Sequence, residues 1–232
     1  MPSLPETMSA IFDRSEALLG SEAMDRLASA RVLVVGVGGV GSWCAEALVR
    51  TGVGHVTLVD DDVVAESNVN RQCPATAKTI GRKKVEVMAE RLRDINPQAD
   101  VTAKSERFET FGGFEGFDVV VDAIDSVDCK AELILGATES GIPVVSSMGA
   151  ALRTDPTKVK VVRFDKVEGD GLAKALRNRF RKLRRFPRKF TCVCSAEIPL
   201  PADPAGPRGS LMPVTATFGM CLAAEAIRLL RG

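Results

Sequence analysis

Three features of the sequence predict an α/β fold with a mainly parallel, doubly wound sheet. Residues 31–60 read as an apolar strand, a glycine-rich turn, a helix and a second strand that ends in an acid. Between residues 84 and 148, short apolar runs alternate with apolar residues at helical spacing. Beyond Met148 this alternation stops. Short apolar strands with helical crossovers form parallel sheets covered on both faces, so we expect a Rossmann-like core followed by an irregular C-terminal extension.

The first unit has the composition of a nucleotide-binding βαβ motif. Its turn contains Gly36, Gly38, Gly39 and Gly41. Such glycines let the backbone bend tightly and approach a phosphate at the helix N-terminus, and Asp60 stands where an acid can hold a ribose. Dinucleotide-dependent dehydrogenases carry nearly the same fingerprint, and glycines also permit close helix–strand packing. The motif therefore predicts a nucleotide site and leaves the nucleotide open.

The next elements follow in order along the chain. A helix is expected at 83–97, where Val85, Met88, Leu92 and Ile95 fall at helical spacing before Pro97. Strands are expected at 101–106 and 118–124, then a helix at 131–141 and a strand at 143–149.

The C-terminal third reads differently. Residues 159–167 and 191–200 resemble strands on either side of a basic stretch, a proline-rich loop covers 199–213, and a closing helix follows. No clear boundary divides the chain, so we expect a single domain over residues 1–232. Within it we expect a nucleotide-binding core at about 10–165, a basic substrate segment at about 166–213 and a closing helix at about 214–232.

Composition favours a soluble, cytoplasmic protein. The 232 residues contain 31 basic and 30 acidic side chains, so a net charge of +1 gives no general attraction to polyanions and any nucleic-acid site must be local. The N-terminus has no basic segment followed by a long apolar run, and no stretch approaches ~20 uninterrupted apolar residues. We expect no membrane partner.

The six cysteines are scattered along the chain, and we expect them to be reduced. Cys192 and Cys194 form a CxC motif without a second pair, and His55 is the single histidine, so a structural zinc site is not expected. The two cysteines read as small buried apolar residues or as a sulfur-handling nucleophile.

The loop after Asp60 is rich in groups that suit a triphosphate. It contains Asp62, Asn68, Asn70, Arg71 and Gln72, and Lys84 follows. An enzyme that handles a triphosphate needs fixed cations for the leaving oxygens, which Arg71 and Lys84 can supply. A nicotinamide enzyme needs little here beyond the ribose acid. Taken alone, each cation also reads as a solvated surface charge.

Two aspartates, Asp122 and Asp125, follow a later buried strand. A carboxylate there could help to hold Mg²⁺ against phosphates, or it could cap the helix that starts near Ser126. Together, the glycine turn, the ribose acid, the two cations and these aspartates favour ATP.

These motifs resemble the ubiquitin-activating-enzyme-like adenylating enzymes over roughly residues 10–165. The resemblance rests on the glycine turn, the N-x-N-R-Q stretch at 68–72, Lys84 and the D-x-x-D at 122–125. Within that family, residues 38–43, 70–72 and 122–127 look most like the bacterial tRNA threonylcarbamoyladenosine dehydratases, and Lys130 also fits their pattern.

The resemblance implies ATP-dependent activation of a carboxylate. It implies that Gly36, Gly38, Gly39, Gly41, Asp60, Asp62, Asn68, Gln72 and Asp122 bind ATP, that Arg71 and Lys84 contact phosphates, and that Asp125 binds magnesium. Relatives can also hold a monovalent cation. Arg14 matches an arginine that reaches the phosphates of a neighbouring subunit, which implies a homodimer. The reaction implied is cyclisation of the threonylcarbamoyl group through an acyl-adenylate, with release of pyrophosphate and then AMP, and His55 is expected to be structural.

Residues 174–189 carry nine basic side chains and no acidic one. Such a concentration of charge favours a tRNA ligand, with Arg177, Arg181, Lys182, Arg184 and Arg185 as the expected contacts. A solvated helix that pairs with acids elsewhere and an anionic membrane surface are the alternatives.

A second function would be adenylation of the C-terminal glycine of a ubiquitin-like sulfur-carrier protein, with a sulfur-transfer partner. Those enzymes usually carry two CxxC pairs and an Asn where this chain has Ser126, so both departures favour the dehydratase. A nucleotide-gated tRNA-binding module and a nicotinamide dehydrogenase are further alternatives, against which Arg71, Lys84 and Asp125 argue.

Overall fold

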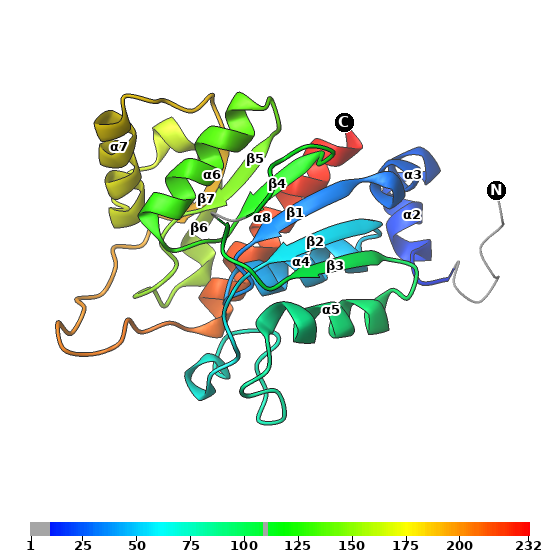
Figure 1. The fold of residues 1–232 in the computed structure, drawn as a ribbon, viewed down its shortest axis with the longest axis horizontal. Coiled ribbons are helices and arrows are strands. Elements are labelled where there is room, and N and C mark those ends of the chain that lie inside the picture. The colour runs from blue at the N-terminus through cyan, green and yellow to red at the C-terminus, as the bar shows by residue number, and fades with distance from the viewer. Residues whose placement is uncertain (1–9, 109–110) are drawn as a thin grey trace.

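A seven-stranded sheet with the order β3-β2-β1-β4-β5-β7-β6 forms the centre of the protein (Figure 1). The computed structural model describes residues 10–108 and 111–232. The strands are β1 (Arg31–Val35), β2 (His55–Val59), β3 (Asp100–Lys104), β4 (Val119–Asp122), β5 (Val144–Ser147), β6 (Val159–Arg163) and β7 (Thr191–Ser195). The helices are α2 (Asp13–Leu19), α3 (Ser21–Ser29), α4 (Gly41–Arg50), α5 (Lys84–Ile95), α6 (Val127–Glu139), α7 (Gly171–Leu183) and α8 (Met212–Arg231), with 3₁₀ turns η1 (Glu66–Asn68), η3 (Pro156–Lys158) and η4 (Phe164–Lys166).

The strand order reverses at β1, which pairs in parallel with β2 on one side and with β4 on the other. All neighbouring strands are parallel except β6 and β7, which are antiparallel. In open α/β sheets, ligands bind outside the carboxyl ends of the strands at such a switch point. The fold therefore places a ligand site where β1 and β4 end.

Both faces of the sheet are covered, as the predicted doubly wound fold requires. The buried residues of β1 alternate between two cores: Val32 and Val34 pack with α4, α5 and α8, while Leu33 and Val35 pack with α6 and α7. Side chains that alternate in this way between two apolar faces give the continuous apolar strand that the sequence shows. The predicted fold class is confirmed.

The C-terminal part is more regular than the sequence predicts. Strands β6 and β7 extend the same sheet, and the longest irregular stretch is residues 196–211, with the proline-rich loop at its centre. The sequence did not indicate this arrangement, because the pattern of a short strand does not show which edge of a sheet the strand joins. Helices α2 and α3, before the first strand, were not predicted either.

Helix α8 packs closely against α4. A Cβ atom at Gly219 would lie 2.5 Å from the carbonyl oxygen of Val40, so only a glycine lets the two helices approach this far. By length and composition alone, α8 is also apolar enough to span a membrane. Its side chains at Phe218 and Leu222 are fully buried in the core, which is the placement of a core helix.

Candidate active site

Two glycines of the turn are required by backbone contacts, and a third borders open space where a ligand could bind. Gly36 has φ +89°, and a Cβ there would lie 2.7 Å from the carbonyl oxygen of Ala123. A Cβ at Gly41 would lie 1.8 Å from the carbonyl oxygen of Gly36. These two glycines are required by the turn itself. A Cβ at Gly38 would meet no atom closer than 3.8 Å, so this position borders open space.

A cavity of about 920 Å³ opens at the carboxyl ends of β1, β2 and β4. Most of the predicted ligand-binding residues line it: Gly36, Gly38, Gly39, Asp60, Asp62, Asn68, Arg71, Gln72, Lys84 and Asp125. Arg14, Gly41 and Asp122 are not among its lining residues. Segments that are far apart in the sequence thus meet at the switch point.

Asp60 is held in place by the backbone on both of its oxygens. The Val37 N–H donates to Oδ2 at 2.7 Å, and the Asp62 N–H donates to Oδ1 at 2.9 Å. Each carboxylate oxygen keeps a further lone pair for a hydroxyl donor. This arrangement fixes the carboxylate at the end of β2, in the position expected for a ribose-binding acid.

Two cations reach the cavity from different elements. Lys84 is the first residue of α5, is buried, and its Nζ lies 2.7 Å from Oδ2 of Asp62. Arg71 lies in the loop after β2, and its Nη1 donates to the Ser67 carbonyl at 2.9 Å and to Oδ1 of Asn70 at 2.8 Å. These contacts orient both side chains, so neither is the freely solvated charge of the alternative interpretation.

Gln72 has a buried acceptor without a partner. The side chain is 7% exposed, it lines the cavity, and its Oε1 has no hydrogen bond among the described residues. An unpaired buried polar atom costs free energy, so it marks a place where a ligand or water donates.

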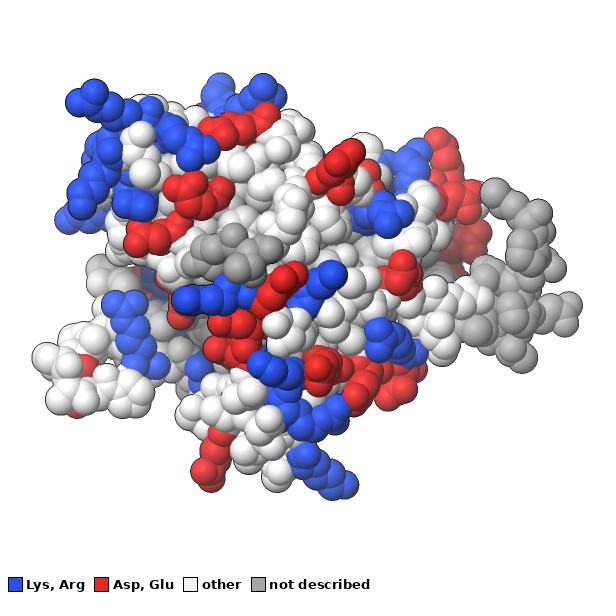
Figure 2. Space-filling view, in the orientation of Figure 1, with Lys and Arg blue, Asp and Glu red and all other residues white. Residues whose placement is uncertain are grey.

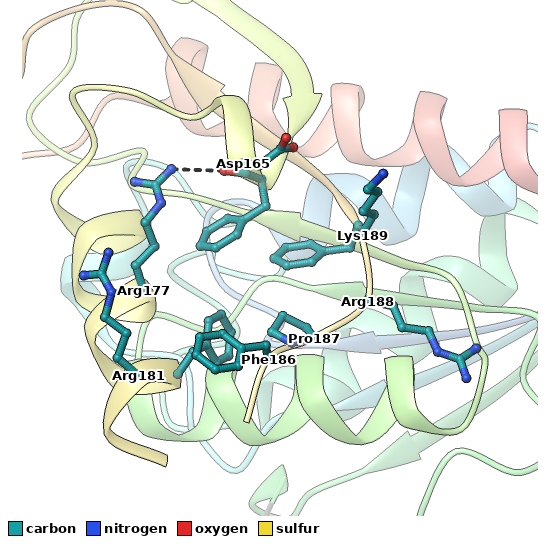
Figure 3. A pocket seen from close by; sticks show the side chains of 10 residues that line it. Asp165, Arg177, Arg181, Phe186, Pro187, Arg188 and Lys189 are labelled. Atoms are coloured by element: carbon teal, nitrogen blue, oxygen red, sulfur yellow. Dashed lines mark hydrogen bonds between the residues drawn. The ribbon is translucent and has the colours of Figure 1, made fainter. Parts of the chain in front are cut away.

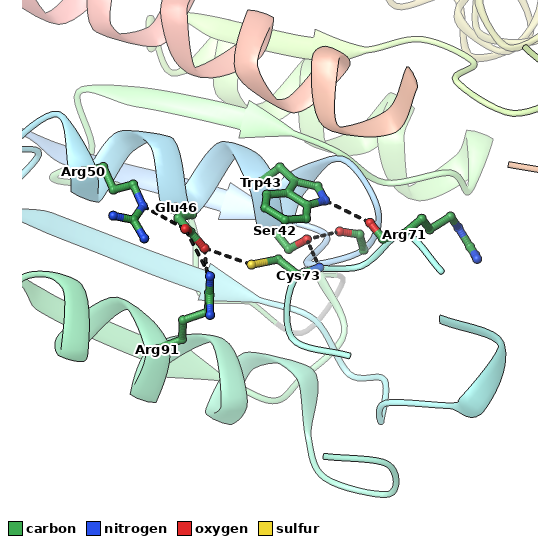
Figure 4. Close-up of polar contacts among 8 residues, drawn as sticks. Ser42, Trp43, Glu46, Arg50, Arg71, Cys73 and Arg91 are labelled. Carbon is green, nitrogen blue, oxygen red and sulfur yellow. Dashed lines mark hydrogen bonds and ion pairs between the residues drawn. The ribbon is translucent and has the colours of Figure 1, made fainter. Parts of the chain in front are cut away.

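Helix α4 holds Arg71 and Cys73 in place through three of its side chains (Figure 4). The indole Nε1 of Trp43 donates to the Arg71 carbonyl at 2.9 Å. The Cys73 N–H donates to the hydroxyl of Ser42 at 3.2 Å, and Sγ of Cys73 lies 3.0 Å from Oε2 of Glu46. The helix that starts at the glycine turn therefore also positions Arg71 and Gln72.

Glu46 is the centre of that network. Arg91 donates to Oε2 at 2.6 Å and Arg50 to Oε1 at 2.8 Å. Burial acts to raise the pKa of Glu46, but the hydrogen bonds from Arg91, Cys73 and Arg50 outweigh it and lower this pKa to about 2. Burial and the bond to Glu46 raise the pKa of Cys73 to about 12, so this thiol stays protonated.

Asp122 lies beneath the cavity rather than in it. Its side chain is fully buried, where Nζ of Lys130 donates to Oδ2 at 2.6 Å and the hydroxyl of Ser146 donates to the same oxygen at 2.5 Å. The structure thus gives Asp122 a supporting position and does not bring it to the ligand space. Asp125 is exposed and lines the cavity. Neither aspartate caps α6, whose N-cap is Ser126.

Arg14 lies on α2, which Figure 1 shows at the end of the sheet opposite to the carboxyl ends of β1 and β4. Its side chain is exposed, and it does not reach the cavity of its own chain.

The predicted tRNA contacts have different surroundings. Figure 2 shows a concentration of basic side chains over α7. The guanidinium of Arg177 donates to the carbonyls of Phe164 and Val167, and Arg185 pairs with Glu132 and Glu139. Arg185 thus matches the alternative of a helix paired with acids, and Arg177 is held by backbone carbonyls. Arg181 donates to Oδ1 of Asn178 on the same helix. Lys182 and Arg184 make no side-chain hydrogen bond or ion pair within residues 10–108 and 111–232.

The other expectations concern the cysteines and the histidine. Cys192 and Cys194 lie fully buried on β7, and burial raises the pKa of both thiols. They therefore match the small apolar residues and not a nucleophile. His55 on β2 faces Asp100 of β3, with Nδ1 3.3 Å from Oδ2, away from the residues that line the cavity.

Two residues of the cavity were missed from the sequence. Arg153 and Asp170 are both almost fully buried and form an ion pair at 3.2 Å. Asp170 also accepts hydrogen bonds from the Gly149 and Ala173 N–H groups, the second of which caps α7. The Asp-Gly pair before the basic helix was a readable N-cap signal.

Comparison with known proteins agrees with this geometry. The model of the ThiF family matches residues 12–232. A tRNA threonylcarbamoyladenosine dehydratase of Escherichia coli is 38% identical in a gapped alignment of 247 positions, which covers 94% of this chain and 92% of that protein. One of Bacillus subtilis is 43% identical over 176 residues, 74% of this chain and 69% of that protein.

Solved structures give the same result. The E. coli dehydratase TcdA in complex with AMP superposes with a TM-score of 0.92 at 37% identity, covering 99% of this chain and 97% of that chain. Its complex with ATP gives a TM-score of 0.90 over the same shares. E. coli MccB with ATP, at 16% identity and a TM-score of 0.67, shares the fold.

Proposed function

Because the chain belongs to the ThiF family, we propose that it uses ATP to dehydrate threonylcarbamoyladenosine in tRNA. The observation that carries this proposal is the similarity, over almost the whole chain, to a dehydratase whose solved structures hold ATP and AMP, combined with a cavity whose lining suits that nucleotide.

The residues of the cavity fit ATP. Gly38 borders open space for the phosphates beside the N-terminus of α4, where backbone N–H groups and the helix dipole favour anions, and Gly39 lets Arg71 approach the same place. The carboxylate of Asp60 accepts hydrogen bonds from the ribose hydroxyls. The unpartnered Oε1 of Gln72 accepts a hydrogen bond from a donor group of the ligand. Arg71 and Lys84 stabilise negative charge on the phosphates.

The reaction needs positioning more than acid–base groups. The carboxylate of the threonylcarbamoyl group attacks the α-phosphorus, and pyrophosphate leaves. An internal nucleophile of the same group then closes a ring on the activated carbonyl and expels AMP. The balance is one water removed from the tRNA for each ATP converted to AMP and pyrophosphate. Arg71, Lys84 and the N-terminus of α4 lie where charge develops on the phosphates.

Magnesium is part of the proposal. The carboxylate of Asp125 is exposed at the cavity and provides the hard oxygen ligand that Mg²⁺ prefers. When bound, the ion neutralises phosphate charge, and a monovalent cation would act in the same sense. Asp62 is tied to Lys84, which leaves Asp125 as the better ligand.

We further propose a cytoplasmic homodimer in which Arg14 completes the cavity of the partner. The position of Arg14 supports this, because its own cavity lies at the other end of the sheet. Isologous contact between two copies is the commonest arrangement for soluble oligomers.

The test is incubation with ATP, Mg²⁺ and tRNA that carries threonylcarbamoyladenosine, followed by mass spectrometry of the nucleosides. We expect the loss of one water from the modified nucleoside, together with AMP and pyrophosphate, and no loss when ATP is omitted. A tRNA left unchanged, with adenylation of a sulfur-carrier protein instead, would contradict the proposal. The burial of Cys192 and Cys194 argues against a partner that exchanges sulfur with these thiols.

A further inference from the structure

A second cavity, of about 250 Å³, lies further along α7. Phe164, Phe180, Phe186 and Phe190 form its walls, and we call it the aromatic cavity. The ring of Phe164 stacks on Phe190 at 4.7 Å and meets Phe180 edge-on at 6.0 Å. The guanidinium of Arg177 lies 5.1 Å from the Phe164 ring centroid and is held by two backbone carbonyls. These contacts make three of the four walls rigid.

The fourth wall is different. Phe186 is 71% exposed and makes no ring contact among the described residues. Figure 3 shows its ring at the lower edge of the aromatic cavity, facing the other aromatic rings. Such an aromatic side chain, held on the surface beside a cavity, offers a free face for stacking.

Positive charge surrounds the aromatic cavity on two sides. Figure 3 shows Arg177 and Arg181 on one side and Arg188 and Lys189 on the other. The side chains of Arg188 and Lys189 make no hydrogen bond or ion pair in the part of the chain that the structure describes. The one acid of the lining, Asp165, is already paired with Arg163. On the first side, Arg177 is held by two backbone carbonyls and Arg181 donates to Oδ1 of Asn178, so Arg188 and Lys189 are the cations without a partner among the described residues. Flat apolar rings beside such cations are the surroundings that suit single-stranded nucleic acid.

We propose that the aromatic cavity takes one unpaired base of the RNA substrate, stacked on Phe186, while Arg188 and Lys189 contact phosphates of the same strand. This inference rests on the proposed function, which makes RNA the substrate. The cavity is smaller than the roughly 300–1,000 Å³ of pockets that hold drug-sized ligands, so it holds a single ring system.

Helix α7 connects this cavity to the ATP cavity. Gly171 and Leu172 in its first turn line the ATP cavity, whereas Phe180 and Arg181 in its third turn line the aromatic cavity. The nine residues from Gly171 to Phe180 rise by roughly 14 Å along the helix. That distance corresponds to about four stacked steps of a nucleic-acid strand at about 3.4 Å each. An unpaired base about four nucleotides from the reacting adenosine can therefore occupy the aromatic cavity.

The test compares a hairpin RNA whose loop carries threonylcarbamoyladenosine with a blunt RNA duplex of the same length. Replacing Phe186 with Ala is expected to weaken hairpin binding by roughly 5- to 150-fold, because one stacked base is lost. Duplex binding is expected to stay unchanged, because paired bases cannot enter the cavity. Phe186→Tyr keeps the stacking face and is expected to bind the hairpin as the wild type does.

Two controls separate stacking from charge and from general damage. Arg188→Glu is expected to weaken hairpin and duplex alike and to reduce the slope of log K against log salt, whereas Phe186→Ala leaves that slope unchanged. Met220→Ala, which alters an exposed apolar residue on α8, is expected to change neither RNA affinity.

The inference is overturned if Phe186→Ala binds the hairpin as tightly as the wild type, or if it weakens hairpin and duplex equally. It is also overturned if Phe186→Ala loses binding to phosphatidylserine vesicles while keeping hairpin affinity, because the cavity would then dock lipid. Dehydration by the wild type is measured in parallel. Its absence would refute the proposed function, whereas normal dehydration with unchanged hairpin binding would refute this inference alone.

Discussion

Arg71 and Lys84 reach the ATP cavity with their orientations already set. Arg71 is held by the Ser67 carbonyl and Asn70, and Lys84 by Asp62. Side chains ordered before the ligand arrives stabilise developing charge without reorganisation in the transition state. Neither side chain belongs to an apolar core, so its loss should affect the reaction far more than the fold.

We therefore expect Arg71→Ala and Lys84→Ala each to lower kcat/KM for dehydration by about 100-fold or more, with a Tm close to that of the wild type. The measurement is the rate of ATP-dependent water loss from modified tRNA. Arg82→Ala is the matched control, because Arg82 is an exposed arginine nearby that pairs with Glu90. An unchanged rate for either cavity variant would refute its assignment to the phosphates.

Asp122 makes a different kind of contribution. Its pair with Lys130 has no exposed surface on either side chain, and removal of one member of such a pair leaves an uncompensated buried charge. We expect Lys130→Met to lower the free energy of unfolding by about 3–5 kcal/mol in a urea titration. Lys158→Met, in the solvent-exposed pair with Asp155, should change it by no more than about 0.5 kcal/mol. Similar values for the two variants would contradict this role.

The sequence could predict which residues come together at the ATP cavity, but not which of them are exposed to it and which are buried beneath it. The chain order placed ten of the predicted ligands around one cavity, because parallel strands end on the same edge. It could not separate Asp122 from Asp125, since the last residue of a buried strand and the third residue beyond it look alike without the position of Lys130. Arg153 and Asp170 escaped because their pairing joins two loops.

Helix α4 joins the glycine turn to the loop that carries Arg71. Because Ser42, Trp43 and Glu46 all hold residues 71–73, a shift of the helix moves the phosphate-binding cation with it. The network depends on the ionised carboxylate of Glu46, which gives it a dependence on pH.

Glu46 has a pKa of about 2 in the folded protein against an ordinary value of 4.5. A lowered pKa in the folded state adds stability that is fully present above pH 4.5 and is lost as the pH falls towards 2. We expect the wild type to exceed Glu46→Gln in unfolding free energy by at most about 3 kcal/mol at neutral pH, with the difference shrinking between about pH 4.5 and 2. Urea titrations at several pH values measure this. The exposed pair of Glu22 with Arg26 provides the control, because Glu22→Gln should produce little difference at any pH. A gap for Glu46→Gln that grew on acidification would contradict the prediction.

Among the elements, the parallel core was the most predictable part. Buried strands such as β1 and β4 have continuous apolar runs, and α5 ends at Ile95, just before Asn96 and Pro97 as predicted. Strands β6 and β7 were recognised as strands, but their pairing at the edge of the same sheet depends on contacts between residues far apart in the chain. The basic segment that contains α7 was recognised by its charge, whereas the aromatic side chains around it come together only in the folded chain.

For the whole molecule, the proposed dimer has a direct test. Arg14→Ala and Lys84→Ala are each expected to be inactive alone. If Arg14 acts on the partner's cavity, each mixed dimer has one complete cavity of its two. After subunit exchange in an equimolar mixture about half of the dimers are mixed, so about a quarter of the wild-type activity should return. Mixing Lys84→Ala with Arg71→Ala is the control, because both changes lie in the same cavity and no mixed dimer has a complete one. No recovery in the first mixture would contradict action between subunits.

The four glycines of the turn have different structural roles, so they should tolerate substitution to different degrees. Gly36 and Gly41 are fixed by backbone contacts within the turn, whereas Gly38 faces open space and a side chain at Gly39 would press on Arg71. A mutant library selected only for soluble expression should therefore retain glycine at 36 and 41 while Gly38 accumulates small residues. A second selection for ATP-dependent activity should bring glycine back at 38 and 39. Selection for folding and selection for activity thus act on different glycines of the same turn. Deep sequencing of the two populations would show which positions each selection conserves.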